Sequence, residues 1–209
     1  MTSFLLVRHG ETLWNRAGRL QGWHDSPLSE AGRAQADALA ARLARERIDS
    51  LVASDLGRTR ETAAPIATRL GIEPALAPGL RERCYGDLEG LTWDEIQRAY
   101  PEAYARLLAR DADYVVSGGE SAMQFRDRVV AAVEQLARAH PGGATIAVVT
   151  HGGVLGMVYR HAMRIGLEMP RTFGIPNAGF NRLRIEGGRW TVEAWAETAH
   201  LPEGALDDE

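Results

Sequence analysis

Short apolar runs of strand length alternate with amphipathic segments along most of this chain. The apolar runs are residues 4–7, 50–54 and 144–150. The segments with helical spacing of apolar side chains are residues 29–47, 59–70, 120–140 and 153–165. Strands that are buried on both faces and separated by helices are typical of a mainly parallel sheet. The pattern therefore predicts an α/β fold.

Cap and turn residues mark the ends of further elements. Thr92 and Glu95 have the spacing of a capping box, which predicts a short helix that ends before Pro101. Gly187 and Gly188 predict the two-residue turn of a hairpin. The strands of this hairpin would be residues 182–186 and 189–196.

Length, charge and cysteine content limit the classes of protein to consider. The chain has no internal repeat or low-complexity linker, so we expect one domain, residues 1–209, that ends in a frayed acidic tail at 207–209. The net charge of −4 does not indicate a basic surface for binding nucleic acid. The apolar run at 4–7 stops at Arg8 and is too short for a signal peptide or a membrane helix. The single cysteine, Cys84, cannot form an internal disulfide. We therefore expect a cytoplasmic protein without nucleic-acid or membrane partners, and the sequence leaves its oligomeric state open.

All 24 basic residues are arginines, because the chain contains no lysine. This absence excludes a Schiff base to pyridoxal phosphate or to a carbonyl substrate, a Walker-type phosphate loop and a lysine general base. Arginine stays charged and offers a planar fork of donors, which suits it to bind carboxylate or phosphate but not to transfer protons.

A His-Gly pair directly follows two of the apolar runs. The histidines are His9, after the first run, and His151, after the third. Arg8 precedes the first pair, and Arg58 lies one turn after the second run. Because ligands of parallel sheets gather at the carboxyl ends of strands, we expect these side chains on one rim if the strands are neighbours.

Two histidines and several arginines fit chemistry on a phosphoryl group. Arginine forks, imidazoles and helix N-termini can all neutralise charge on the phosphoryl oxygens, and an imidazole can carry the group as phosphohistidine. His9 is the better nucleophile candidate, because Arg8 and the loop at 11–15 surround it with donors. Lysine is absent and arginine does not titrate, so a carboxylate is the natural candidate for the proton donor, and Glu82, between basic neighbours, is one such candidate. The spacing offers no zinc site, and we expect neither a metal nor another cofactor.

Four sequence landmarks, in order, resemble the histidine phosphatase superfamily, also called phosphoglycerate mutase-like. They are residues 6–12 (Leu-Val-Arg-His-Gly-Glu-Thr), 54–58 (Ser-Asp-Leu-Gly-Arg), 80–82 (Leu-Arg-Glu) and 150–152 (Thr-His-Gly). The flanking residues 21–23 and 26–29 resemble its phosphatase branch. The resemblance implies a three-layer α/β/α sandwich, with a mainly parallel sheet and helices on both faces. It also implies a metal-free, two-step reaction on a small phosphorylated metabolite.

The resemblance implies a catalytic role for each of five residues. His9 would be the nucleophile that becomes phosphohistidine. Arg8, Arg58 and His151 would hold the phosphoryl oxygens and stabilise the transition state. Glu82 would protonate the leaving group and then activate the hydrolytic water.

The same resemblance implies further contacts to the bound molecule. Asn15 and Gly152 would contact the phosphate, while Gln21, Gly22 and Arg60 would line the substrate side, although Arg60 could equally face solvent.

Specificity is expected in two segments, residues 21–25 and 99–119. Trp14, Trp23 and Tyr85 could wall an apolar substrate pocket there or could serve ordinary packing.

Two alternatives to a phosphatase remain. Phosphoglycerate mutases resemble this chain but have His in place of Cys84, an Asn-Lys pair at 92–93, and adjacent substrate-gripping arginines in a longer insertion. The arginines in residues 100–120 of this chain are Arg106 and Arg110, which are not adjacent. Because the substrate-gripping pair is missing, hydrolysis is favoured over the mutase reaction. A phospholigand-binding module that has lost turnover is disfavoured, because all the catalytic positions are filled.

Overall fold

A six-stranded sheet forms the centre of the computed structural model, which describes residues 1–140 and 142–201. The strands are β1 (Thr2–Arg8), β2 (Ser50–Ala53), β3 (Ala75–Leu76), β4 (Thr145–Thr150), β5 (Phe180–Glu186) and β6 (Arg189–Glu197). Their order across the sheet is β3-β2-β4-β1-β5-β6. The first four of these are parallel to one another, and β5 and β6 add an antiparallel edge.

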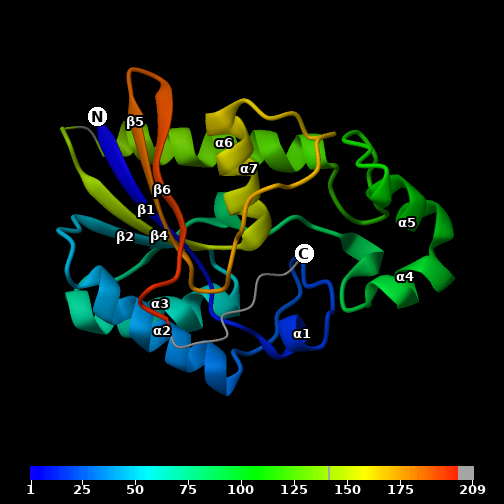
Figure 1. Ribbon diagram of the computed structural model, residues 1–209, viewed down its shortest axis with the longest axis horizontal. Coiled ribbons are helices and arrows are strands. Elements are labelled where there is room, and N and C mark those ends of the chain that lie inside the picture. The colour runs from blue at the N-terminus through cyan, green and yellow to red at the C-terminus, as the bar shows by residue number, and fades with distance from the viewer. Residues whose placement is uncertain (141, 202–209) are drawn as a thin grey trace.

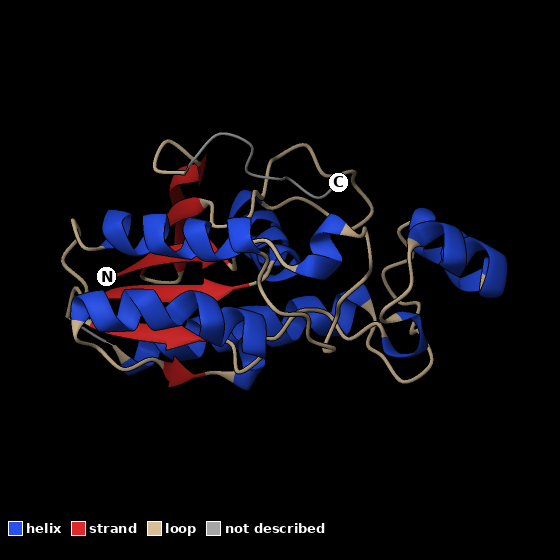
Figure 2. Cartoon of the chain, turned by 90° about the horizontal axis from the view of Figure 1, so that it is seen from below, coloured by secondary structure: helices blue, strands red, loops and turns tan. Residues whose placement is uncertain are grey.

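Helices cover both faces of the sheet (Figures 1 and 2). The long helices are α2 (Glu30–Leu43), α3 (Gly57–Leu70), α6 (Ala122–Ala139) and α7 (Gly152–Met163). The pair α2 and α3 packs on one face, and the pair α6 and α7 packs on the other. The three-layer α/β/α sandwich that the resemblance implied is therefore confirmed.

The apolar runs are continuous because each central strand contributes to two cores. Phe4 and Leu6 of β1 pack with Phe125 of α6. Leu5 and Val7 point to the opposite face and pack under α2 and α3. Side chains alternate between the faces of a strand, so a strand covered on both sides needs apolar residues at every position.

Two further helices form a lobe beside the sheet (Figure 1). They are α4 (Trp93–Ala99) and α5 (Pro101–Leu108), which pack around a small apolar cluster of their own. The predicted capping box is present, since Thr92 Oγ1 accepts the Glu95 N–H and Glu95 Oε2 accepts the Thr92 N–H. The short helix before Pro101 is thus confirmed.

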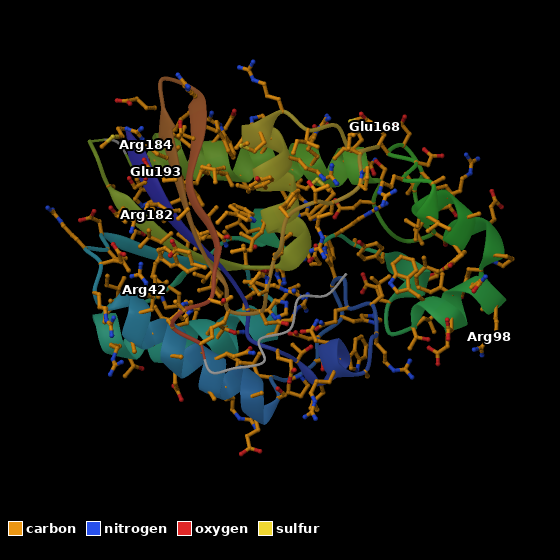
Figure 3. The ribbon with its side chains drawn as sticks, in the orientation of Figure 1. Arg42, Arg98, Glu168, Arg182, Arg184 and Glu193 are labelled. Atoms are coloured by element: carbon orange, nitrogen blue, oxygen red, sulfur yellow. The ribbon has the colours of Figure 1, made fainter. Side chains whose placement is uncertain are left out.

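One predicted helix is too long. The helix expected to reach residue 47 ends at Leu43, because the Glu46 N–H bonds to the Leu43 carbonyl and tightens the chain into a turn. The Glu46 carboxylate then accepts bonds from Arg42 and Arg182, each at 2.8 Å. Figure 3 labels these two arginines, which lie on the same side of the molecule. The turn after α2 is therefore tied to β5.

Most other boundaries agree with the sequence analysis. Helix α3 ends at Leu70 and is capped by Gly71, whose φ of 65° is the left-handed conformation that favours glycine. The hairpin of β5 and β6 is confirmed, with Gly187 and Gly188 in its turn. Short helical turns that were not predicted are α1 (Leu13–Arg16), η1 (Pro78–Leu80) and η2 (Gly86–Leu88). The predicted acidic tail at 207–209 lies outside the described residues. In the part of the chain that the structure describes, no helix is both long and apolar enough to cross a membrane.

Candidate active site

His9 and His151 lie side by side at the carboxyl ends of β1 and β4. These strands are parallel neighbours with Arg8 opposite Thr150, so the residues that follow them share one edge of the sheet. The centroids of the two imidazole rings are 5.3 Å apart, and the ring planes are inclined by 64°. The expected meeting of the two His-Gly pairs is therefore confirmed by the strand pairing.

Hydrogen bonds fix both the ring and the backbone of His9. Its Nδ1 lies 2.8 Å from the Gly10 carbonyl oxygen. A carbonyl can only accept, so Nδ1 carries the proton and Nε2 keeps the lone pair. The His9 carbonyl accepts bonds from the Asn177 amide at 3.1 Å and from the Ala178 N–H at 3.2 Å. The imidazole is thus oriented with Nε2 as its nucleophilic atom.

Burial and neighbouring cations keep both histidines neutral. Burial, followed by the positive charges of Arg58 and Arg8, holds the pKa of His9 well below its ordinary value of 6.5. Burial is also the main cause of the low pKa of His151, and Arg58 is the next. An unprotonated imidazole is the form that can attack an electrophile.

His151 is buried and held by the end of β2. Its Nε2 lies 2.9 Å from the Ser54 hydroxyl, while its buried Nδ1 has no hydrogen-bond partner among the described residues. The buried Nε of Arg58 also has no partner within that part of the chain. Buried polar atoms are normally satisfied, so these two mark a place for a polar ligand.

Arg58 enters the site from the first turn of α3. Its side chain is only 1 % exposed. One Nη donates to the Gly22 carbonyl at 2.8 Å, and the other donates to the His24 carbonyl at 2.9 Å and to Asp25 Oδ1 at 3.1 Å. The guanidinium is therefore fixed by the loop at residues 22–25.

Arg8 lies against the start of α7. Its Nη1 donates to the Ile175 carbonyl at 2.7 Å. A Cβ atom at Gly152 would lie 3.3 Å from Arg8 Nε, which is a tight contact. The glycine thus allows the guanidinium to approach the positive N-terminal end of the helix.

The Glu82 carboxylate is oriented by two backbone N–H groups. Its Oε1 accepts from Arg83 and its Oε2 from Gly153, each at 2.8 Å. The Glu82 carbonyl accepts from the Trp23 indole at 2.9 Å and from Arg128 at 3.1 Å. Both the backbone and the side chain of this residue are held from neighbouring elements.

Two carboxylates that the sequence analysis did not single out organise the loop at 22–25. The Glu89 side chain, 3 % exposed, accepts the N–H groups of Trp23 at 2.9 Å, His24 at 2.8 Å and Tyr85 at 2.9 Å. Asp25 accepts the first two N–H groups of α3. No periodic signal could have identified these residues, since all their partners except Tyr85 lie more than 30 residues away in the sequence.

A pocket of about 480 Å³ opens onto this site. Its lining residues from the predicted set are Arg8, His9, Asn15, Gln21, Gly22, Arg58, Glu82 and Gly152. Trp14 and Tyr85 also line it, whereas Trp23 does not. The volume exceeds what a phosphoryl group needs and leaves space for an organic part of the ligand.

The structure places three predicted features outside the lining of this pocket. His151, expected to hold the phosphoryl oxygens, is fully buried behind it, against His9. Arg60, expected on the substrate side, lies along a separate hollow with Ala64 and Thr68. Each residue of an α-helix is rotated by about 100° around the helix axis from the one before it. Arg58 and Arg60 are two residues apart, so they point to nearly opposite sides of α3. Residues 99–119, expected to set specificity, supply none of its described lining; α7 and the segment up to Ile175 do so instead.

The arrangement suits an anion with several oxygens. Two guanidinium groups, the His9 imidazole and a single carboxylate, Glu82, line one end of the pocket, and the buried His151 imidazole packs against His9. Among the described residues, no three His, Cys, Asp or Glu side chains are grouped so that they could hold a metal ion. Such a centre can bind a phosphoryl group, offer it a nucleophilic nitrogen and supply a carboxyl group for proton transfer.

Comparisons with known proteins agree with this geometry. Residues 4–198 match the model of the histidine phosphatase superfamily (branch 1). The chain is 41 % identical over 204 residues to a metal-independent phosphoserine phosphatase of Arabidopsis thaliana, covering 96 % of this chain and 84 % of that protein. It is 38 % identical over 203 residues to the phosphoglycerate mutase-like protein 4 of the same plant, covering 95 % and 86 %.

The solved structure of Bacillus stearothermophilus YhfR superimposes with a TM-score of 0.88 at 32 % identity, over 96 % of this chain and 99 % of that one. The family match spans almost the whole chain. It includes the whole sheet except the first two residues of β1, and therefore both strand ends that carry the histidines. This chain belongs to the histidine phosphatase superfamily, branch 1.

Proposed function

We propose that this protein is a metal-independent phosphatase that hydrolyses phosphomonoesters of small metabolites through a phosphohistidine on His9. The observation that carries the proposal is the pairing of two features: a buried, neutral His9 whose Nε2 keeps its lone pair, and buried nitrogens of Arg58 and His151 that have no hydrogen-bond partner among the described residues. The phosphatase and mutase-like relatives support an enzyme that handles small phosphorylated molecules. The single cysteine supports a cytoplasmic location.

In the first step, His9 Nε2 attacks phosphorus, and the bond from phosphorus to the ester oxygen breaks. The Glu82 carboxyl group gives its proton to the departing oxygen, which leaves as the alcohol. Arg8, Arg58 and His151 donate hydrogen bonds to the phosphoryl oxygens while charge spreads over them. Asn15, Gln21, Gly22 and Gly152 line the space for the phosphate and the alcohol.

In the second step, the Glu82 carboxylate takes a proton from a water molecule, whose oxygen attacks phosphorus. The bond from phosphorus to Nε2 breaks, inorganic phosphate forms, and Glu82 is again protonated. The Gly10 carbonyl keeps the proton on Nδ1 throughout, so Nε2 recovers its lone pair.

The test is release of inorganic phosphate from p-nitrophenyl phosphate and from 3-phosphoglycerate, each with a metal chelator present. We expect chelator-insensitive phosphate release that disappears in His9→Ala. Quenching in alkaline detergent after brief mixing with radiolabelled substrate should trap phosphate on the protein that is stable to base and labile to acid, and His9→Ala should not be labelled.

Other outcomes would replace the proposal. Conversion of 3-phosphoglycerate to 2-phosphoglycerate without phosphate release would identify a mutase. Binding of phosphate esters without turnover of any ester in a broad panel would identify a binding module.

A further inference from the structure

Ser54 belongs to one of the four sequence landmarks, yet the proposed reaction gives it no role. Its side chain is fully buried at the end of β2. The pairing of Ala53 with Val149 places Ser54 beside the end of β4, where His151 follows. The hydroxyl oxygen of Ser54 lies 2.9 Å from His151 Nε2. A residue that holds one of the two histidines is therefore left without an assigned function.

The backbone of Ser54 is fixed on two sides, so its hydroxyl is presented from a defined place. The Ser54 N–H donates to the Val149 carbonyl at 3.0 Å, and the Ser54 carbonyl accepts from the Thr59 hydroxyl at 2.8 Å. The first bond ties the residue to β4 and the second ties it to the first turn of α3. The hydroxyl oxygen accepts the Leu56 N–H at 3.5 Å, which is a weak bond. The hydroxyl proton remains to be donated.

The Ser54 hydroxyl and the His151 imidazole can share their protons in two ways. A neutral imidazole has one N–H and one lone pair, and a hydroxyl has one proton and two lone pairs. If Ser54 donates to Nε2, one group of the pair stays without a hydrogen bond, the N–H on Nδ1. If Nε2 donates to Ser54, two groups stay without one: the lone pair of Nδ1 and the Ser54 proton, for which residues 1–140 and 142–201 offer no other acceptor. Because unpaired buried polar groups are costly, donation by Ser54 is favoured.

The two histidines then carry the proton on the same ring atom but offer opposite functions. In His9, the N–H on Nδ1 is bound to the Gly10 carbonyl, which leaves the lone pair on Nε2. In His151, the lone pair on Nε2 is bound to the Ser54 hydroxyl, and within the described residues the N–H on Nδ1 has no acceptor. The partner of each ring thus makes one imidazole a nucleophile and the other a hydrogen-bond donor.

We propose that Ser54 is a positioning residue that fixes the proton of His151 on Nδ1, so that this nitrogen donates to an oxygen of the phosphoryl group. The proposal rests on the proposed function, since it assigns the donor atom and its support in the same reaction. The centroids of the two imidazole rings are 5.3 Å apart, a separation that a phosphoryl group on His9 can bridge. A buried donor that is oriented before the reaction stabilises the negative charge that spreads over the phosphoryl oxygens in the transition state.

The chemistry of the hydroxyl matters, because the opposite tautomer would oppose the reaction. A lone pair on Nδ1 would face negatively charged oxygens in a buried site, where the repulsion is weakly screened. A backbone carbonyl in the place of the Ser54 hydroxyl would require the proton on Nε2 and would impose that tautomer. A hydroxyl can donate, so it supports the tautomer that binds phosphate.

NMR of isotope-labelled protein tests the tautomer directly, because protonated and unprotonated imidazole nitrogens have well separated chemical shifts. In the wild type at neutral pH, the His151 tautomer with the proton on Nδ1 should be in about tenfold excess or more, and added inorganic phosphate should keep it so. In Ser54→Ala without phosphate, both tautomers leave the same number of groups unpaired, so both nitrogen signals should move toward intermediate positions. Thr2→Val is the control: it removes another buried hydroxyl, which donates to the His140 carbonyl at 3.1 Å, and should leave the His151 signals unchanged.

Kinetics test whether the oriented donor contributes to turnover. Ser54→Ala should lower kcat by about tenfold, since the His151 ring loses both its fixed proton and its anchor. The loss should be equal on p-nitrophenyl phosphate and glycerol 3-phosphate, because His151 acts on the phosphoryl oxygens and not on the leaving group. Thr2→Val should keep the wild-type kcat on both esters.

Two substitutions of His151 separate its ring nitrogens and leave Ser54 in place. The amide nitrogen of asparagine takes about the position of Nδ1, whereas that of glutamine takes about the position of Nε2, and both can donate. His151→Asn should therefore keep about tenfold more activity than His151→Gln. This pair and the wild-type spectrum decide the proposal even if Ser54→Ala does not fold.

Three results would each overturn the proposal: a wild-type His151 with its proton on Nε2, an unchanged kcat in Ser54→Ala, or activity in His151→Gln equal to or above that in His151→Asn. Failure of the wild type to hydrolyse any ester would instead count against the proposed function. The His151 tautomer in the presence of inorganic phosphate would then decide whether Ser54 fixes the proton.

Discussion

His9 and His151 lie among arginines, and this position makes their protonation unfavourable. Burial has the largest effect on the pKa of both imidazoles, and the charge of Arg58 has the second largest. A protonated His9 would have no lone pair on Nε2. The cations that suit a phosphoryl group therefore also keep His9 nucleophilic near neutral pH.

The buried imidazoles should make folding sensitive to acid. Their folded-state pKa values lie below 6.5, so the unfolded chain binds more protons as the pH falls below that value. The free energy of unfolding should then decrease by up to about 1.4 kcal/mol per pH unit for each histidine. Urea denaturation at several pH values between 7.5 and 5 measures this slope.

Variants separate the two contributions. His9→Gln and His151→Gln should each make the dependence on pH shallower, and the double variant should make it shallower still. If the double variant keeps the wild-type slope, the acid sensitivity comes from other groups.

Glu82 is expected to matter most for poor leaving groups. Glu82→Gln keeps the shape of the side chain but removes the proton donor. Turnover of glycerol 3-phosphate should fall by about a hundredfold or more, whereas p-nitrophenyl phosphate, whose leaving group needs little protonation, should lose far less. Steady-state kinetics on both esters give the comparison, and an equal loss on the two would rule out the acid role.

At the scale of elements, the first turn of α7 matters because it begins with two glycines. Gly152 and Gly153 let Arg8 and Glu82 approach the helix N-terminus, where backbone N–H groups are free to bind them or a ligand. Residues of β1 and of the segment that follows η1 thus meet at the N-terminus of α7. A helix with ordinary residues there would exclude the carboxylate.

Gly153→Ala should displace the Glu82 carboxylate from the N-terminus of α7. A Cβ atom at residue 153 would lie 2.1 Å from Glu82 Oε1, so the carboxylate must move. We expect kcat on glycerol 3-phosphate to fall between about tenfold and a hundredfold, while stability changes little because alanine favours helices.

Gly156→Ala is the matched substitution one turn later. The nearest atom to its Cβ would be Ile175 Cδ1 at 3.6 Å, an ordinary contact. It should cost much less activity than Gly153→Ala. Similar losses in both variants would mean that crowding of Glu82 is not the cause.

At the scale of the whole molecule, Arg128 connects α6 to the segment that carries Glu82. Its guanidinium donates to the carbonyls of Gly79 at 3.0 Å, Arg81 at 2.9 Å and Glu82 at 3.1 Å, and it pairs with Glu120. One side chain thus binds three carbonyls of a segment with little regular structure. The layer on one face of the sheet thereby sets the position of the carboxylate.

Arg128→Met should loosen this connection. Losing the bonds to these partly buried carbonyls should lower the free energy of unfolding by about 2 kcal/mol and reduce turnover with both good and poor leaving groups. Arg126→Met is the control and should change neither, since Arg126 lies two residues away on α6 and, in the part of the chain that the structure describes, its guanidinium pairs with its neighbour Asp127. Denaturant titrations of both variants give the answer, and equal stabilities would refute this role.

Much of the fold and part of the site follow from local rules. The continuous apolar runs predict central strands, and cap residues such as Thr92, Ser29 and Gly71 mark helix ends, because these signals depend on neighbours in sequence. The end of α2 at Leu43 was missed, since the turn after it is held by Arg182 of a distant strand.

The sequence by itself determined which chemistry this protein can perform: the residues at the strand ends are histidine and arginine, and no lysine is present. Only the tertiary structure decided how the site is built and how far it extends. It placed Arg60 along a separate hollow and brought in Glu89 and Asp25 to hold the loop at residues 22–25. The physical reason is that a strand end depends on its adjacent residues, whereas a contact across the pocket depends on how helices pack against the sheet.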